Sequence, residues 1–191
     1  MKVHEVEVKA SLLETPDMDE ARRFSEVIEN KLEKAGARFE ARLIQEDIYL
    51  THPSRNLAST DESFRLRSEE REGELSLRLT YKGPKVSEHS KARFEKEVEV
   101  SANGRMDLME ILHRLGFGEL MTVRKQRGMY DLGGIEVDLD IVEGLGVFCE
   151  MEILSDDIGE AESRILKVMG SMGWSRFERR SYLELLLSKQ F

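Results

Sequence analysis

The chain has 191 residues, of which 40% are hydrophobic and 35% are charged, and its formal net charge is −9. This length suits one domain over residues 1–191 with a sizeable buried core. The composition excludes a disordered tail, and the acidic balance speaks against a broad nucleic-acid interface, which needs a basic excess. No apolar run reaches membrane-spanning length, and the charged start MKVHEVEVKA lacks the apolar core of a signal peptide. We therefore expect neither a membrane nor a nucleic acid as a partner.

Cysteine and histidine usage gives no sign of a zinc or thiol enzyme. The single Cys149 cannot form an intramolecular disulfide, so a reducing cytoplasm is the expected compartment. Its neighbours in GVFCEMEI predict a small buried hydrophobe and not a nucleophile. The four histidines (His4, His52, His89 and His113) are scattered, and none has zinc-ligand spacing. No P-loop or dinucleotide-binding glycine motif is present, which argues against a nucleotide-binding α/β fold.

The predicted elements begin with a strand over 4–10 and a helix that starts near Asp17. Gly36 stands where the C-terminal cap of that helix would fall. One helix face is apolar at helical spacing, with Phe24, Val27, Ile28 and Leu32.

The rest of the chain alternates strands with a few helices. Strands are predicted over 41–52, 63–70, 73–84 and 92–101, and several more lie around glycine turns in 121–154. Helices are predicted over 105–117, 157–174 and 180–189. The polar, basic segment 82–93 is expected to be a loop, either a mobile lid or an ordinary hairpin connection. Many antiparallel strands with interspersed helices indicate an α+β fold.

Charged residues recur at every second position of these strands. In the first strand, Glu5, Glu7 and Lys9 share one face, and Val6 and Val8 share the other. Later strands repeat the pattern with Gln45, Asp47, Tyr49, Arg65, Arg67, Ser76, Arg78, Thr80, Lys82, Arg93, Glu95, Glu97, Glu99, Lys125, Arg127, Glu136, Asp138, Asp140, Glu150 and Glu152. The apolar faces can be covered by the helices, whereas the charged faces must meet either water or one another. A sheet that curls would enclose them in a polar tunnel, which we favour over a solvated face.

Such a lining suits a phosphate ligand with a metal ion. Arginine and lysine match polyphosphate oxygens, and carboxylates without histidine or cysteine suit Mg²⁺ or Mn²⁺. Together they are what metal-assisted phosphoryl chemistry needs. The alternative is a network of structural ion pairs, which is costly to bury.

Several motifs occur in a family-specific order along the chain. They are EVEVK at 5–9, LR at 66–67, YKGP at 81–84, RFEKE at 93–97, VRKQR at 123–127, VDLDIVEGLGVFCEMEI at 137–153 and RRSYLELL at 179–186. This series resembles the CYTH superfamily, the triphosphate tunnel metalloenzymes, and within it the class IV adenylyl cyclases. Other members are thiamine triphosphatases and inorganic tripolyphosphatases.

The resemblance implies a closed antiparallel β-barrel with flanking helices, usually a homodimer, which binds a nucleoside or inorganic triphosphate with Mg²⁺ or Mn²⁺. It implies metal-binding acids at Glu5, Glu7, Asp140 and Glu150, which together with Lys9 form the predicted catalytic set. It implies triphosphate-binding bases at Lys9, Arg65, Arg67, Arg78, Lys82, Arg93, Lys125, Arg127 and Arg180.

Three functions are consistent with this reading. The first is an adenylyl cyclase that converts ATP to cyclic AMP and pyrophosphate. The second is a tripolyphosphatase or thiamine triphosphatase, which uses nearly the same residues with water as the nucleophile. The third is a non-catalytic polyphosphate-binding or nucleotide-binding module, against which the paired acids argue because carboxylates weaken anion binding unless a cation intervenes.

Overall fold

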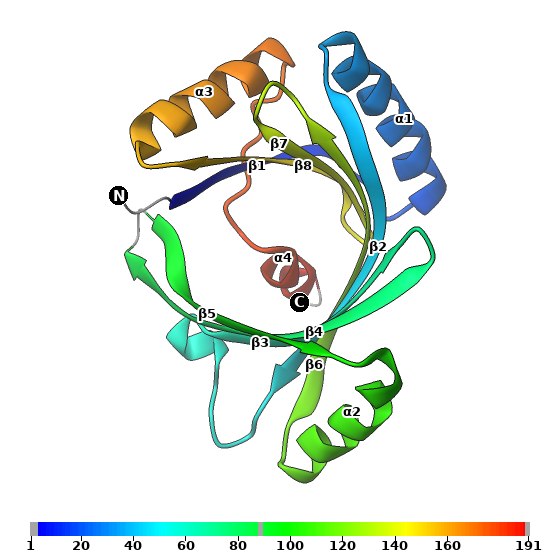
Figure 1. Cartoon of the computed structure of the whole chain (residues 1–191), viewed down its shortest axis with the longest axis vertical. Coiled ribbons are helices and arrows are strands. Elements are labelled where there is room, and N and C mark those ends of the chain that lie inside the picture. Colours follow the sequence, from blue (N-terminus) through cyan, green and yellow to red (C-terminus); the bar gives the residue numbers. More distant parts are fainter. Residues whose placement is uncertain (1–3, 88–89, 190–191) are drawn as a thin grey trace. The chain divides into compact units, whose positions relative to one another are not determined.

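The computed structural model describes residues 4–87 and 90–189, with side chains omitted over 85–93 (Figure 1). The strands are β1 (His4–Glu14), β2 (Arg38–Thr51), β3 (Ser63–Arg71), β4 (Glu74–Ser87), β5 (Ser90–Val100), β6 (Gly118–Asp131), β7 (Glu136–Val142) and β8 (Gly146–Ser155). The helices are α1 (Met18–Lys34), α2 (Arg105–Arg114), α3 (Ile158–Ser171) and α4 (Tyr182–Ser188), with short 3₁₀ turns η1 (Ala58–Thr60) and η2 (Ala102–Gly104). Within the described residues, every helix is too short or too polar to cross a membrane.

The strands form one eight-stranded sheet, which confirms the predicted α+β class. Their hydrogen-bonded order is β1-β8-β7-β6-β2-β3-β4-β5, with antiparallel pairing of β1 with β8, β8 with β7, β7 with β6, β3 with β4 and β4 with β5. Strands β1 and β5 stand at the two ends of this order. Closure of the sheet into the predicted barrel is therefore treated as part of the proposed function.

The chain divides into two compact units. Unit 1 comprises Met1–Leu43 and Lys125–Phe191, and unit 2 comprises Ile44–Arg124. The single domain expected over 1–191 stays a prediction, and each unit is described here by itself.

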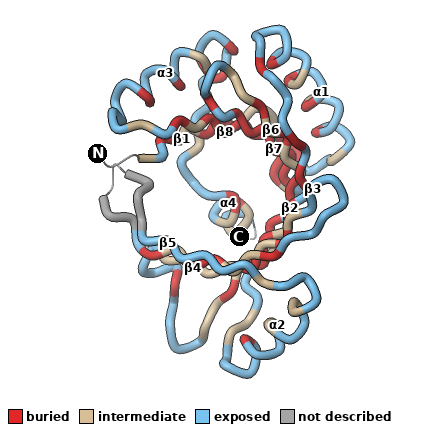
Figure 2. The backbone as a smooth tube through the Cα atoms, in the orientation of Figure 1, coloured by how far each residue is buried: buried red, intermediate tan, exposed pale blue. Residues whose placement is uncertain are grey.

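In unit 1, α1 and α3 lie along one side of strands β1, β7 and β8, and α4 lies on the other side (Figure 1). The core between helices and sheet contains Ile28 and Leu32 of α1, Ile165 and Met169 of α3, and Val137 of β7. Residues of β7 and most of β8 are buried on both faces, as the red segments of Figure 2 show. A strand buried on both faces needs partners on the side away from α1 and α3 as well.

Local signals account for the helix boundaries. The side chain of Asp17 accepts hydrogen bonds from the first turn of α1, and that of Asp157 does the same for α3. Gly36 has a φ of +91°, as expected just after the helix end. The buried face of α1 is rotated from the predicted one, because Ala21 and Ser25 are buried while Val27 is 62% exposed.

Cys149 is fully buried, as predicted, and burial raises the pKa of its thiol well above the ordinary value. A thiol in this environment stays protonated and acts as a small apolar side chain.

In unit 2, Leu108, Met109 and Leu112 of α2 pack with Ile48 and Leu50 of β2. The apolar face of β5 is covered less than expected, since Phe94 and Val98 are 62% and 60% exposed.

The loop predicted over 82–93 is wrong for most of its length. Strand β4 continues to Ser87 and β5 begins at Ser90, and the two strands pair as far as Ser87 with Ser90. Register shifts between Lys82 and Ser87 let the ladder pass Gly83 and Pro84. Glu88 and His89 lie outside the described residues, and the lid stays a prediction.

Candidate functional site

Strand register places the predicted acids and bases of unit 1 on one face of the sheet. Directly paired residues of antiparallel strands point to the same side. Three rows cross neighbouring strands: Glu7, Glu152 and Glu136; Lys9, Glu150 and Asp138; Asp140 and Arg127. We call the first of these the acid row. The alternation seen in the sequence therefore becomes a continuous charged surface.

A buried aspartate organises the bases of this surface. Asp140 is fully buried and accepts hydrogen bonds from Lys125 Nζ at 2.9 Å, from Arg127 Nε at 2.7 Å, and from Arg127 Nη2 at 2.6 Å. The hydroxyl of Tyr182 donates a fourth at 2.9 Å. We call these four residues the Asp140 cluster. Burial alone would raise the pKa of Asp140, but the charges of Arg127 and Lys125 hold it well below its ordinary value.

Arg127 joins three carboxylates in this cluster. Besides Asp140, its guanidinium contacts Asp138, and it donates to Glu150 Oε2 at 2.6 Å. Although burial disfavours a charged group, these acids raise the pKa of Arg127 well above its ordinary value. Burial raises the pKa of Asp138 to about 7 despite the opposing charge of Arg127. Arg127 is thus held as a cation amid acids, one of which titrates near neutrality.

Tyr182 reaches the cluster from α4. Its ring centroid lies 4.5 Å from Lys9 Nζ and 5.3 Å from Lys125 Nζ, distances typical of cation–π contacts. An edge-to-face contact with Phe148, at 5.1 Å between ring centroids, fixes the ring. A capping box in which Ser181 and Glu184 exchange hydrogen bonds starts the helix directly before Tyr182.

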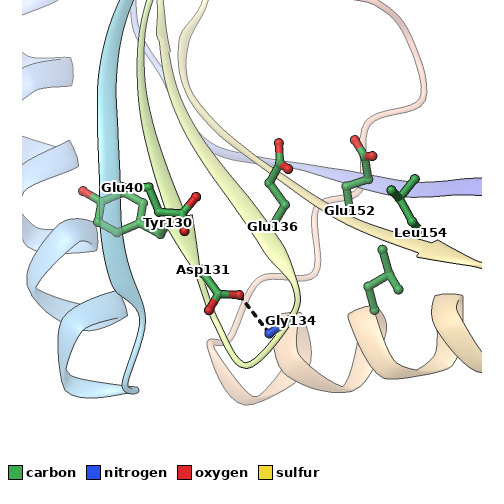
Figure 3. Close-up of a pocket in the computed structure, with 8 residues that line it drawn as sticks. Glu40, Tyr130, Asp131, Gly134, Glu136, Glu152 and Leu154 are labelled. Atoms are coloured by element: carbon green, nitrogen blue, oxygen red, sulfur yellow. Dashed lines mark hydrogen bonds between the residues drawn. The ribbon is translucent and has the colours of Figure 1, made fainter. Parts of the chain in front are cut away.

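Two members of the acid row, Glu136 and Glu152, line a cavity of about 310 Å³. Figure 3 shows the carboxylates of Glu136 and Glu152 side by side in its wall, with Asp131 bonded to the backbone N–H of Gly134 in the adjoining turn. Burial raises the pKa of Glu152 to about 8, with smaller contributions from the charges of Glu5, Glu136 and Glu7. Among residues 4–87 and 90–189, no group of three or more acidic, histidine or cysteine side chains is arranged as metal ligands.

Unit 2 contains a second aspartate that holds two bases. Asp47 accepts from Arg67 Nε at 2.6 Å and Nη2 at 2.7 Å, and from Arg65 Nη1 at 3.0 Å. The hydroxyl of Tyr49 lies 3.5 Å from the same Arg65 nitrogen. We call these four residues the Asp47 cluster. Asp47 is 4% exposed, so both arginines are ordered by a buried counterion.

The remaining predicted bases of unit 2 lie along β4. Register pairs Arg67 with Arg78, and Ser63 with Lys82, which places these bases on the face of Arg65. Lys82 forms an ion pair with Glu95 at 2.9 Å, and Arg78 contacts Glu97 at 3.4 Å. The side chain of Arg93 lies outside the described ones.

Glu5 and Arg180, which are also predicted site residues, are exposed and lie outside the two buried clusters. Glu5 is exposed on β1, although its charge contributes to the raised pKa of Glu152. Arg180 forms an ion pair with Glu178 at 2.7 Å, and its side chain is 55% exposed, so it is not gathered around Asp140.

Sequence reasoning left several residues out of the predicted site. They are Asp47, Glu136, Asp138, Glu152 and Tyr182. The first four had a usable signal, because the period-two pattern already placed them on charged faces. The only sequence feature that singled out Tyr182 was its place in the RSY motif. No local pattern in its helix indicated a contact with Asp140.

The profile of the CYTH domain matches residues 4–182. The chain is therefore a member of the CYTH domain family, which confirms the resemblance seen in its motifs. The charged faces described above belong to a protein of this class.

Named relatives and a solved structure support the membership. The Methanocaldococcus jannaschii protein named "Putative adenylate cyclase MJ0240" is 36% identical over 160 residues, which cover 81% of this chain and 88% of that protein. Adenylate cyclase CyaB of Aeromonas hydrophila is 27% identical over 146 residues, covering 74% and 71% of the two chains. The structure of the PH1819 protein from Pyrococcus horikoshii is similar at 40% identity, with a TM-score of 0.75 and coverage of 97% and 99%.

Proposed function

We propose that this protein is a divalent-metal-dependent enzyme acting on a triphosphate, with adenylyl cyclase as the leading activity. The observation that carries the proposal is the Asp140 cluster, where Lys125 and Arg127 are kept charged and ordered on the face that also carries the acid row. Ordered cations of this kind bind phosphate oxygens strongly. Two relatives named as adenylate cyclases favour the cyclase among the triphosphate reactions.

The proposal includes closure of the sheet into the barrel that the family resemblance implies, with its charged faces turned inward. Burial of β7 on both faces supports this for unit 1, since a solvated outer sheet face would leave alternate residues exposed. The homodimer stays a prediction.

The acids fit a divalent cation by their chemistry. Glu7, Glu136 and Glu152 are hard oxygen donors in one row, and their mutual repulsion contributes to the raised pKa of Glu152. We propose that the acid row (Glu7, Glu136 and Glu152), together with Glu5 and Glu150 as the family resemblance implies, would hold Mg²⁺ or Mn²⁺. The ion would supply neutralisation of phosphate charge and a more acidic nucleophile.

Asp140 has a different proposed role from the metal-binding one predicted for it. Its two oxygens already accept four hydrogen bonds, three of them from Lys125 and Arg127. We therefore assign it to holding the bases.

In the cyclase reaction, the ribose 3′-oxygen bonds to the α-phosphorus while the bond to the bridging oxygen breaks. Pyrophosphate leaves, and the proton of the hydroxyl is released. We propose that Lys125 and Arg127 bind the β- and γ-phosphates and stabilise the charge that develops on the leaving group.

Hydrolysis of tripolyphosphate or thiamine triphosphate is the second candidate. Apart from Tyr49 and Tyr182, the side chains of the Asp140 and Asp47 clusters are charged groups, which recognise phosphate and not a particular organic substituent. The same contacts would serve a water nucleophile.

Product analysis with ATP, tripolyphosphate and thiamine triphosphate, each with Mg²⁺ and with Mn²⁺, separates these activities. Glu7→Gln should abolish turnover without lowering the melting temperature. Glu14→Gln is the matched control, because Glu14 lies on the same strand but is exposed and paired with Arg176 at 2.5 Å. Full activity of Glu7→Gln would overturn the metal assignment, and failure to process any triphosphate would overturn the function.

A further inference from the structure

Tyr182 contacts Lys9, Lys125 and the buried carboxylate of Asp140. Its hydroxyl donates to Asp140, the carboxylate that also accepts from Lys125 and Arg127. Its ring lies against the ammonium groups of both Lys9 and Lys125.

We propose that Tyr182 is a positioning residue for triphosphate binding, an inference that rests on the proposed function. Its ring keeps the Lys9 and Lys125 ammonium groups apart and oriented. Its hydroxyl supplies Asp140 with a neutral donor, which remains when Lys125 and Arg127 turn toward phosphate. The free-energy cost of moving these bases from carboxylate to phosphate is thereby reduced.

The chemistry of the hydroxyl suits this role. Burial and the neighbouring Asp140 raise the pKa of Tyr182 well above its ordinary value, so the group stays protonated. A fully buried carboxylate that lost all its donors would carry a large desolvation cost. One permanent donor limits that cost while the cations engage the ligand.

The contacts of α4 also separate this role from simple packing. Phe148 packs edge-to-face against the Tyr182 ring, and Leu185 is buried one turn further along the helix. Tyr182→Phe keeps the ring and its contacts and removes only the hydroxyl. Tyr182→Leu removes both the hydroxyl and the cation–π contacts.

The test is calorimetric binding of inorganic tripolyphosphate to the full chain, both with Mg²⁺ and in EDTA, together with KM and kcat for whichever triphosphate is turned over. Tyr182→Phe should weaken tripolyphosphate binding roughly tenfold, and Tyr182→Leu should weaken it further. KM should rise with little change in kcat. Leu186→Ala, in the same helix near Gly144, is the matched control and should bind like the wild type.

The outcomes distinguish this inference from the proposed function. If the wild type binds and Arg127→Ala loses binding while Tyr182→Phe does not, Tyr182 is structural and only this inference fails. Tighter binding by Tyr182→Leu would show that the helix obstructs the site and would overturn the inference as well. Equal weakening by Leu186→Ala would assign the effect to helix docking. If the wild type binds no triphosphate, the proposed function and this inference fall together.

Discussion

The Asp140 cluster of unit 1 and the Asp47 cluster of unit 2 are built alike but differ in burial. Each has one buried aspartate that holds two cationic side chains, with a tyrosine hydroxyl close by. Around Arg127 the three acids Asp138, Asp140 and Glu150 face the three bases Lys9, Lys125 and Arg127. The side chains of Lys125 and Asp140 are 6% and 0% exposed, whereas those of Arg67 and Asp47 are 18% and 5% exposed.

Bases that are matched by acids are strongly ordered, but they must exchange a carboxylate for a phosphate when a ligand arrives. Side chains that are more exposed are partly solvated, so the loss of a shared carboxylate leaves them less isolated from water. The following variants test this contrast.

The largest effect is expected on stability, from removal of the central acids. Asp140→Asn should lower the free energy of unfolding by about 3–5 kcal/mol, because it leaves buried cations with less counter-charge. Asp47→Asn should cost about 1–3 kcal/mol, because the side chains of Arg65 and Arg67 are 14% and 18% exposed and can be partly solvated, whereas Lys125 is only 6% exposed. Urea unfolding at pH 7 measures both, and equal losses would contradict the contrast.

The next effect concerns substrate binding. Arg127→Ala should lower kcat/KM by about tenfold to a hundredfold, equivalent to about 1.5–3 kcal/mol, for every triphosphate that the enzyme accepts. Lys82→Ala should lower it less, because the Lys82 side chain is 29% exposed and its ion pair with Glu95 is partly solvated. Arg22→Ala, on the exposed face of α1, is the control. Wild-type kinetics for Arg127→Ala would remove unit 1 from the site.

A third effect is a pH dependence of stability to which Glu152 of the acid row contributes, in addition to Asp138, whose pKa is about 7. Glu152 titrates near pH 8 in the folded chain and near its ordinary value of 4.5 when unfolded. Between these values the folded state binds more protons, so this group makes stability fall as pH rises from about 4.5 to about 8. Glu152→Gln should therefore melt at a higher temperature than the wild type at pH 9, and the difference should shrink below pH 5. Thermal unfolding from pH 5 to pH 9 measures this difference in melting temperature. A difference that does not change with pH would contradict the repulsion of Glu152 by its neighbouring acids.

Added Mg²⁺ provides an independent check on the same row. A cation that binds the folded chain stabilises it by mass action. Mg²⁺ should raise the melting temperature of the wild type more at pH 9 than at pH 6, and it should do so much less in Glu152→Gln. An identical Mg²⁺ effect in both proteins would contradict the proposed metal ligands.

The smallest effect is expected at the solvated edge of unit 2. Arg78 and Glu97 are 43% and 36% exposed and 3.4 Å apart, so Arg78→Ala should change the free energy of unfolding by about 0–1 kcal/mol. A loss comparable with that of Asp47→Asn would show that β4 and β5 carry more of the electrostatic stability than their exposure suggests.

Much of this protein could be predicted from the period-two pattern alone. Glu5, Glu7 and Lys9 share a face because successive strand residues point to opposite sides, whatever the strand pairs with. The same rule predicted the shared face of Arg65, Arg67, Arg78 and Lys82, which the register confirms. Helix ends at Asp17 and Gly36 were also predictable, since capping depends on residues adjacent in the chain.

Only the tertiary structure decided which charges meet. Asp140 and Tyr182 are 42 residues apart, and the motif around Tyr182 contains no local signal of that contact. Pairing with a neighbouring strand continued β4 and β5 through a polar segment whose composition predicts a loop, because ladder hydrogen bonds can outweigh local propensity. Local patterns determine on which side of a strand a side chain lies, whereas its partners, burial and pKa depend on residues that folding brings from elsewhere in the chain.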